Sequence, residues 1–126
     1  MTTDQKKVFL LLKSVILHHQ GLEEGEKKML TAIASIIHAS EELVWTQEFI
    51  LKDQPTAFER ARQYLNTLVI DWGKDTRIDL MGQVWESTSQ KGFITEIEAT
   101  AILKLAKDWD IQKELVTLIR KKRNTV

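Results

Sequence analysis

The residues of this chain best suited to chemistry lie close together around Gly21. Two histidines precede the glycine and three glutamates follow it: His18, His19, Glu23, Glu24 and Glu26. Imidazole and carboxylate groups are common ligands of divalent metals. Adjacent residues of a helix point about 100° apart, however, so both imidazoles cannot easily hold one ion. We therefore interpret the histidines as a helix end, where the helix dipole favours positive charge.

Other reactive sites have little support in the sequence. The chain has no Cys, which excludes a thiolate nucleophile, a thiolate metal site and a disulfide. It contains neither a Gly-x-Ser-x-Gly elbow nor a Gly-rich phosphate loop. Glu86 is an isolated carboxylate, whereas acid–base catalysis needs a placed partner group. We predict that the protein is not an enzyme.

Length and charge restrict the organisation and the partners. The chain has 126 residues, which suits one domain over residues 1–126. Eighteen basic and eighteen acidic residues cancel, so the long-range field that attracts nucleic acid or anionic membranes is missing. We expect neither of these partners. The first apolar run has no small-residue cleavage site after it, which favours a cytoplasmic protein.

The elements are organised around residues 8–17, of which eight are apolar. This run is too short for a bilayer, which needs about 20 apolar residues. Its apolar residues recur at helical spacing and also cover the other sides. Such a segment is typical of a central helix that neighbours cover on several faces. We expect amphipathic helices to surround it.

The remaining pattern predicts an all-α fold, a single compact bundle of six to seven helices. There is one Pro in the chain, and apolar residues recur with a period near 3.6. Ser40 fits as the N-cap of a third helix, and Gly73 as a left-handed residue after a fourth. Thr76 fits the start of a fifth helix. Thr95 and Glu98 form the clearest capping box in the sequence.

The two halves of the chain resemble each other. Gly21 matches Gly92 at an offset of 71 residues, and beyond these turns the offset becomes 72. The matched pairs there are Glu26 with Glu98, Leu30 with Ile102, Ile33 with Leu105, and Ala34 with Ala106. This pattern predicts two helical hairpins related by a weak internal repeat.

The second hairpin resembles the TerB-like family, which is named for tellurite resistance. Gly92 is followed by apolar residues, the cap Thr95 and a Glu-rich helix start at Glu98. The run Trp109-Asp110-Ile111 then resembles the family's break before its next helix. The resemblance implies a bundle of about seven helices covering nearly the whole chain. It also implies a stress-associated protein.

The family's acidic residues have been linked to divalent metals, and an Asp before the turn glycine belongs to that set. Gln20 and Lys91 stand there instead in this chain. Only Glu26 and Glu98 match the family's acidic positions. The alternative function is therefore a divalent-metal-binding protein that uses Glu23, Glu26 and Glu98 at the hairpin turns. Apart from such a metal, we expect no cofactor.

The leading expectation is a non-enzymatic cytoplasmic module that acts through protein–protein contacts, with another protein or a second copy as partner. Four Trp residues are many for a chain of this size. Core packing is the ordinary role of each, but an exposed Trp would suit a partner surface. Trp45 is the best candidate, because Gln47 and Glu48 flank its side of the helix.

Overall fold

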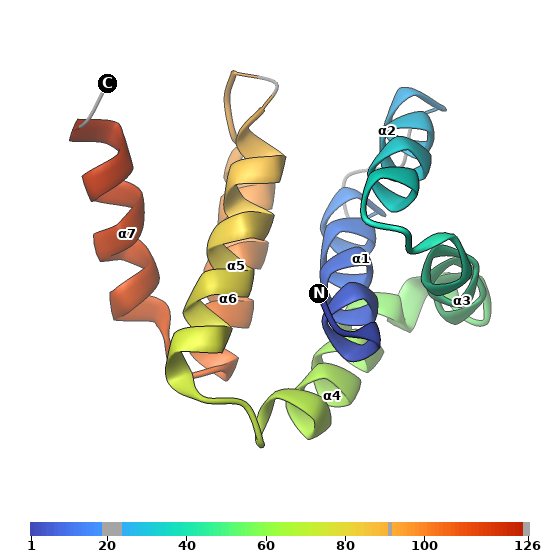
Figure 1. Ribbon diagram of the computed structural model, residues 1–126, viewed down its shortest axis with the longest axis horizontal. Helices are drawn as coiled ribbons and strands as arrows, with labels where there is room; N and C mark the ends of the chain where they lie inside the picture. Colours follow the sequence, from blue (N-terminus) through green and yellow to red (C-terminus); the bar gives the residue numbers. More distant parts are fainter. Residues whose placement is uncertain (19–23, 91, 125–126) are drawn as a thin grey trace. The chain divides into compact units, whose positions relative to one another are not determined.

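The computed structural model describes residues 1–18, 24–90 and 92–124, and every regular element in these ranges is helical. The elements in chain order are α1 (Thr3–His18), α2 (Glu24–Ile36), α3 (Ser40–Leu51), the 3₁₀ turn η1 (Gln54–Thr56), α4 (Ala57–Val69), α5 (Lys74–Ser89), α6 (Glu96–Asp108) and α7 (Gln112–Asn124) (Figure 1). The predicted all-α fold is confirmed. None of the described helices is long and apolar enough to cross a membrane.

The chain divides into two compact units, Met1–Leu65 and Asn66–Val126, and each is described by itself. The single domain over residues 1–126 stays a prediction. Gly21 and Glu23 lie outside the described residues.

Helix α1 is the buried centre of the first unit, as its apolar run predicts. Residues 8–12, Val15 and Ile16 are all at most 5% exposed. Within this unit α1 packs against both α2 and α3. Its first turn is closed by Thr2 and Gln5. The Gln5 N–H donates to Thr2 Oγ1 at 3.1 Å and the Thr2 N–H donates to Gln5 Oε1 at 2.9 Å, which is a capping box.

The internal repeat is confirmed by the bounds of the helices. Helices α1 and α5 both have 16 residues, and both bounds of α5 lie 71 residues after those of α1. Helices α2 and α6 both have 13 residues, with bounds 72 residues apart. Helices α3 and α7 also start 72 residues apart. The repeat therefore extends over three helices in each half, and α4 lies between the halves in the chain.

The ends of α2 and α6 are built alike. His38 and Asp110 adopt left-handed backbones, with φ of 56° and 58°. Each is followed by a residue whose N–H reaches back five positions: Ala39 N–H to Ala34 O at 2.7 Å, and Ile111 N–H to Ala106 O at 2.9 Å. These are the long bonds of Schellman motifs, which satisfy carbonyls at a helix end. The predicted break at Asp110 is confirmed.

The start of α3 differs from the prediction. Ala39, not Ser40, is the N-cap, and no side chain makes a capping bond there. The predicted Ser40 cap is therefore wrong. Ala39 already closes the Schellman motif and is completely buried. This position serves two helices at once, so a small apolar residue takes the place of a capping hydroxyl.

The start of α5 also differs. Gly73 has φ −61° and ψ 154° and is the N-cap of α5, so the predicted left-handed glycine is wrong. Helix α5 begins at Lys74, and Thr76 lies in its first turn rather than at its cap. The end of α4 is satisfied instead by Arg77, whose Nε donates to Val69 O at 3.0 Å and to Trp72 O at 3.1 Å.

Candidate functional site: the turn before α6

The described part of the turn between α5 and α6, residues 92–95, begins with a glycine of unusual backbone conformation. Gly92 has φ of 99°, a conformation that L side chains rarely adopt. Its N–H donates to Ser89 O at 3.0 Å, which continues the end of α5. Glycine at residue 92 therefore lets the chain leave α5 and reverse toward α6.

The capping box at Thr95 is confirmed. Thr95 Oγ1 accepts the Glu98 N–H at 3.1 Å, and Glu98 Oε1 accepts the Thr95 N–H at 3.0 Å. The Glu98 side chain is completely buried. Its carboxylate thus holds the first turn of α6 against the preceding loop.

Two large apolar residues flank this capping box and remain in contact with solvent. Phe93 precedes the box and is 61% exposed, and Ile97 in the first turn of α6 is 51% exposed. We call these two residues the turn surface. Sequence reasoning did not single them out. No sequence signal separates them from core residues, because their exposure depends on how the turn folds.

The predicted metal ligands belong to different parts of the chain. Glu23 is outside the described residues, and Glu26 is half-buried on α2 in the first unit. Glu98 belongs to the second unit and bonds to the backbone of its own cap. Within the described ranges, no group of three or more His, Asp or Glu side chains could hold a metal ion. The metal site stays a prediction.

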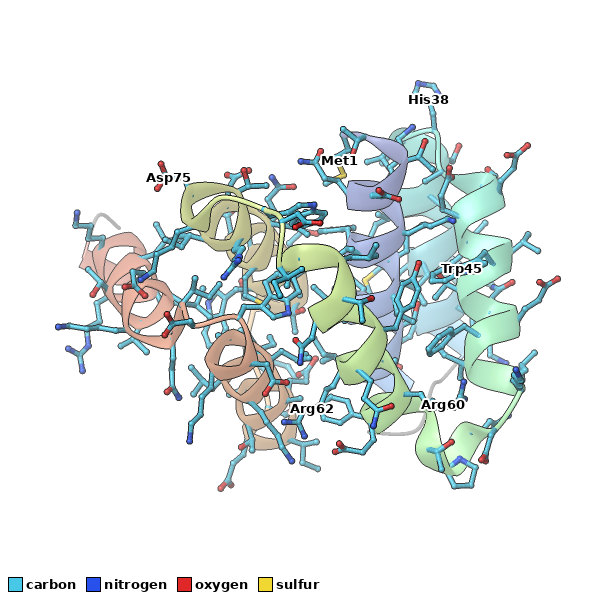
Figure 2. The ribbon with its side chains drawn as sticks, turned by 90° about the horizontal axis from the view of Figure 1, so that it is seen from below. Met1, His38, Trp45, Arg60, Arg62 and Asp75 are labelled. Carbon is cyan, nitrogen blue, oxygen red and sulfur yellow. The ribbon has the colours of Figure 1, made fainter. Side chains whose placement is uncertain are left out.

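Trp45, the best candidate for an exposed Trp, is half-buried, in line with the ordinary role of Trp in core packing. Its ring centroid lies 5.6 Å from that of Phe49, one turn along α3, and 5.3 Å from that of Tyr64 on α4. Lys7 Nζ lies 5.1 Å from the Trp45 centroid. Figure 2 shows Trp45 on α3, with Arg60 on α4. Aromatic pairing and a cation–π contact therefore occupy the ring within its own unit.

The other three Trp residues are not exposed either. Trp109 is 1% exposed at the end of α6, whereas Trp72 and Trp85 are half-buried. Core packing, the ordinary role of Trp, thus describes all four better than partner binding.

Tyr64 is the titratable group of this aromatic cluster. Burial raises the pKa of its phenol, and the nearby carboxylate of Asp4 raises it further. Both causes disfavour the phenolate. The cluster therefore keeps a neutral tyrosine, which suits packing between helices rather than proton transfer near neutral pH.

Comparisons with family models, curated proteins and solved structures find no match for this chain. Conclusions about its function therefore rest on its own residues.

Proposed function

We propose that this chain is a non-enzymatic, cytoplasmic helical module of the TerB-like kind that acts in a stress response, such as tellurite resistance, by binding another protein. The family resemblance is supported by Gly92, the Thr95 cap and the break at Asp110, and by the repeated helices. The observation that supports protein binding is the exposure of two large apolar residues, Phe93 and Ile97, on either side of the Thr95 cap.

The affinity of the turn surface depends on the apolar area that a partner buries and on the conformational entropy that the turn loses. Large apolar side chains contribute most of the energy of protein interfaces when a partner buries them. Ordering a flexible loop on binding subtracts from that energy. Here Gly92 and the Thr95–Glu98 capping box define the backbone before any partner arrives. The turn surface can therefore bind a partner at a small cost in conformational entropy.

Site-specific crosslinking tests this proposal. A photoreactive amino acid in place of Ile97 is expected to crosslink one discrete protein in the native cell. The crosslinked protein, identified by mass spectrometry and purified, should then bind the unmodified chain. The double variant Phe93→Ser, Ile97→Ser should weaken this binding about 100-fold, because a few buried apolar anchors contribute about 1–2 kcal/mol each.

Ile70 supplies the matched control. It is 70% exposed in the same unit, but it lies outside the turn. Ile70→Ser should leave the dissociation constant unchanged. Equal weakening by Ile70→Ser and by the turn variant, or no specific crosslink from residue 97, would contradict the proposal.

A further inference from the structure

Helices α3 and α7 are the third helices of the two repeats. Their outer faces carry charges of opposite sign. Equivalent residues, 72 positions apart, are Glu41 and Lys113, Val44 and Val116, and Glu48 and Arg120. In each helix the spacing of three and then four residues places the set on one face. The apolar residue is the same in both helices, and both flanking charges are reversed.

These residues are accessible. Glu41, Glu48, Lys113 and Arg120 are exposed, Val44 is 53% exposed and Val116 is half-buried. Within the part of the chain that the structure describes, Glu41, Glu48 and Arg120 form no ion pair. The acidic residue on this part of α7, Glu114, already bonds to Lys74 at 3.1 Å. The outer face of α7 therefore presents a positive charge at each end, and that of α3 a negative one.

We propose that the outer face of α3 binds the outer face of α7 of a second copy of this chain. With the two helices antiparallel, Glu41 lies opposite Arg120 of the second copy, and Glu48 opposite its Lys113. The two valines then meet in the middle. Equal spacing of seven residues between the charges allows both ion pairs to form together.

A second copy fits because the chain itself carries both complementary faces. Each chain can take part in the contact through α3 or through α7. Each exposed ion pair contributes about 0.2–1 kcal/mol and is screened by salt. The association is therefore weak, and it should be stronger at low ionic strength. The proposed contact between α3 and α7 uses a different surface from the turn surface of the proposed function.

Charge reversal of one opposed pair tests the contact. Sedimentation velocity of the full chain at low salt, over rising concentration, should show association that high salt weakens. Glu48→Lys and Lys113→Glu should each raise the dissociation constant about tenfold, since a pair in each contact becomes repulsive. Both changes suit the dipoles of their own helices, because Glu48 lies in the second half of α3 and Lys113 in the first turn of α7.

Mixing the two variants gives the decisive result. In an equimolar mixture of Glu48→Lys and Lys113→Glu, both kinds of contact between unlike variants again join opposite charges, and association should return to the wild-type level. Lys121→Glu is the matched control, because it changes an exposed lysine elsewhere on α7. Because Lys121→Glu alone keeps the contact intact, it is combined with Glu48→Lys in one chain, and this double variant should stay as weak as Glu48→Lys. A monomeric wild-type chain at low salt, no recovery in the test mixture, or equal recovery in the Glu48→Lys, Lys121→Glu double variant overturns the proposal.

Discussion

Lys6 and Arg77 occupy equivalent positions, 71 residues apart, and each donates to the backbone just after the second helix of its own repeat. Lys6 Nζ on α1 donates to His38 O at 3.0 Å, and Arg77 Nη1 on α5 donates to Trp109 O at 3.1 Å. A helix end leaves carbonyls without intrahelical partners and carries partial negative charge. In each unit, a cation on the preceding helix donates a hydrogen bond to such a carbonyl and offsets the partial negative charge.

Arg77→Ala should lower the free energy of unfolding by about 2–4 kcal/mol, because hydrogen bonds to a charged group contribute about 1.5–3 kcal/mol each and are not additive. The guanidinium also donates to three carbonyls after α4 or at its end: Val69, Ile70 and Trp72. Its loss leaves the ends of two helices without these partners. Urea unfolding monitored by circular dichroism measures the change.

Lys6→Ala is the comparison, because the equivalent Lys6 donates one exposed hydrogen bond to His38. We expect a cost below about 1 kcal/mol. Arg77→Lys should fall between the two, since an ammonium cannot reproduce the fork of the guanidinium. Equal costs for Arg77→Ala and Lys6→Ala would mean that the additional carbonyl bonds contribute nothing.

Thr95→Ala should lower the free energy of unfolding by about 1 kcal/mol, which is the usual cost of losing an N-cap side chain. The substitution removes the oxygen that accepts the Glu98 N–H at 3.1 Å. Thr95→Ser keeps that oxygen and should cost only a few tenths of a kcal/mol. A loss of stability as large for Ser as for Ala would show that the methyl group of Thr95, rather than the cap, is important. Thermal and urea unfolding of the two variants measure the difference.

The sequence predicts those features that depend on local chemistry. The run at residues 8–17 indicates a buried central helix because it is apolar on every side. The Thr95–Glu98 box is predicted because both partners lie within four residues and serve one helix. The repeat is visible because equivalent apolar positions keep their spacing. In each case the deciding interaction lies within a short stretch of chain or in a regular pattern.

The wrong predictions concern groups whose partners lie elsewhere. Gly73 was predicted to be a left-handed residue that ends α4, but the carbonyls at that end accept hydrogen bonds from Arg77 on the next helix. Ser40 looked like a cap, but the buried Ala39 joins two helices there. The exposure of Phe93 depends on how the turn is folded, which a pattern of apolar residues does not reveal. Trp45 was the best candidate for an exposed Trp because its flanking residues are polar, but its ring packs against Tyr64 on another helix.

Tyr64 should titrate above the ordinary tyrosine pKa of 10.0, because burial and the Asp4 carboxylate both disfavour its phenolate. It is the one tyrosine of the chain, so the change in near-ultraviolet absorbance that accompanies phenolate formation reports this residue alone, since the four Trp residues do not ionise. A raised folded-state pKa means that its contribution to stability is complete below about pH 10 and is lost as pH rises through the folded-state value. Asp4→Asn should lower the measured pKa partway.

Tyr64→Phe provides the control for stability. The variant has no phenol to ionise, so its free energy of unfolding should decrease less above pH 10 than that of the wild type. A Tyr64 pKa at or below 10.0 in the folded chain would contradict the partial burial of the phenol beside Trp45 and Phe49.

Calcium and magnesium should bind no more tightly than millimolar. Calcium prefers about six to eight oxygen ligands, and magnesium needs a near-octahedral set. Glu98 already accepts the N–H of Thr95, and the sequence has Lys91, a cation, directly before Gly92. An ammonium near the ion opposes binding. Calorimetric titration measures the affinity. A micromolar dissociation constant that Glu26→Gln abolishes would favour the metal-binding alternative.

Gly82→Leu should lower the free energy of unfolding by about 1–3 kcal/mol, as overpacking of a close helix contact usually does. A Cβ at Gly82 on α5 would lie 2.9 Å from Leu118 Cδ2 on α7. The equivalent positions in the first unit hold Leu11 and Thr46, both completely buried. In the first unit the large residue, Leu11, lies on the first helix of the repeat. In the second unit the large residue, Leu118, lies on the third helix.

Because the large and the small residue exchange places between the two units, we predict that a second substitution, at Leu118, restores the stability that Gly82→Leu loses. Leu118→Thr in the Gly82→Leu background recreates the Leu11 and Thr46 combination and should recover at least about 1 kcal/mol, measured as the coupling energy of a double-mutant cycle. Gly25→Leu is the control, because nothing lies within 4 Å of a Cβ there. It should stabilise α2 slightly, since Leu has a higher helix propensity than Gly. A coupling energy near zero would mean that α5 and α7 do not meet at residues 82 and 118.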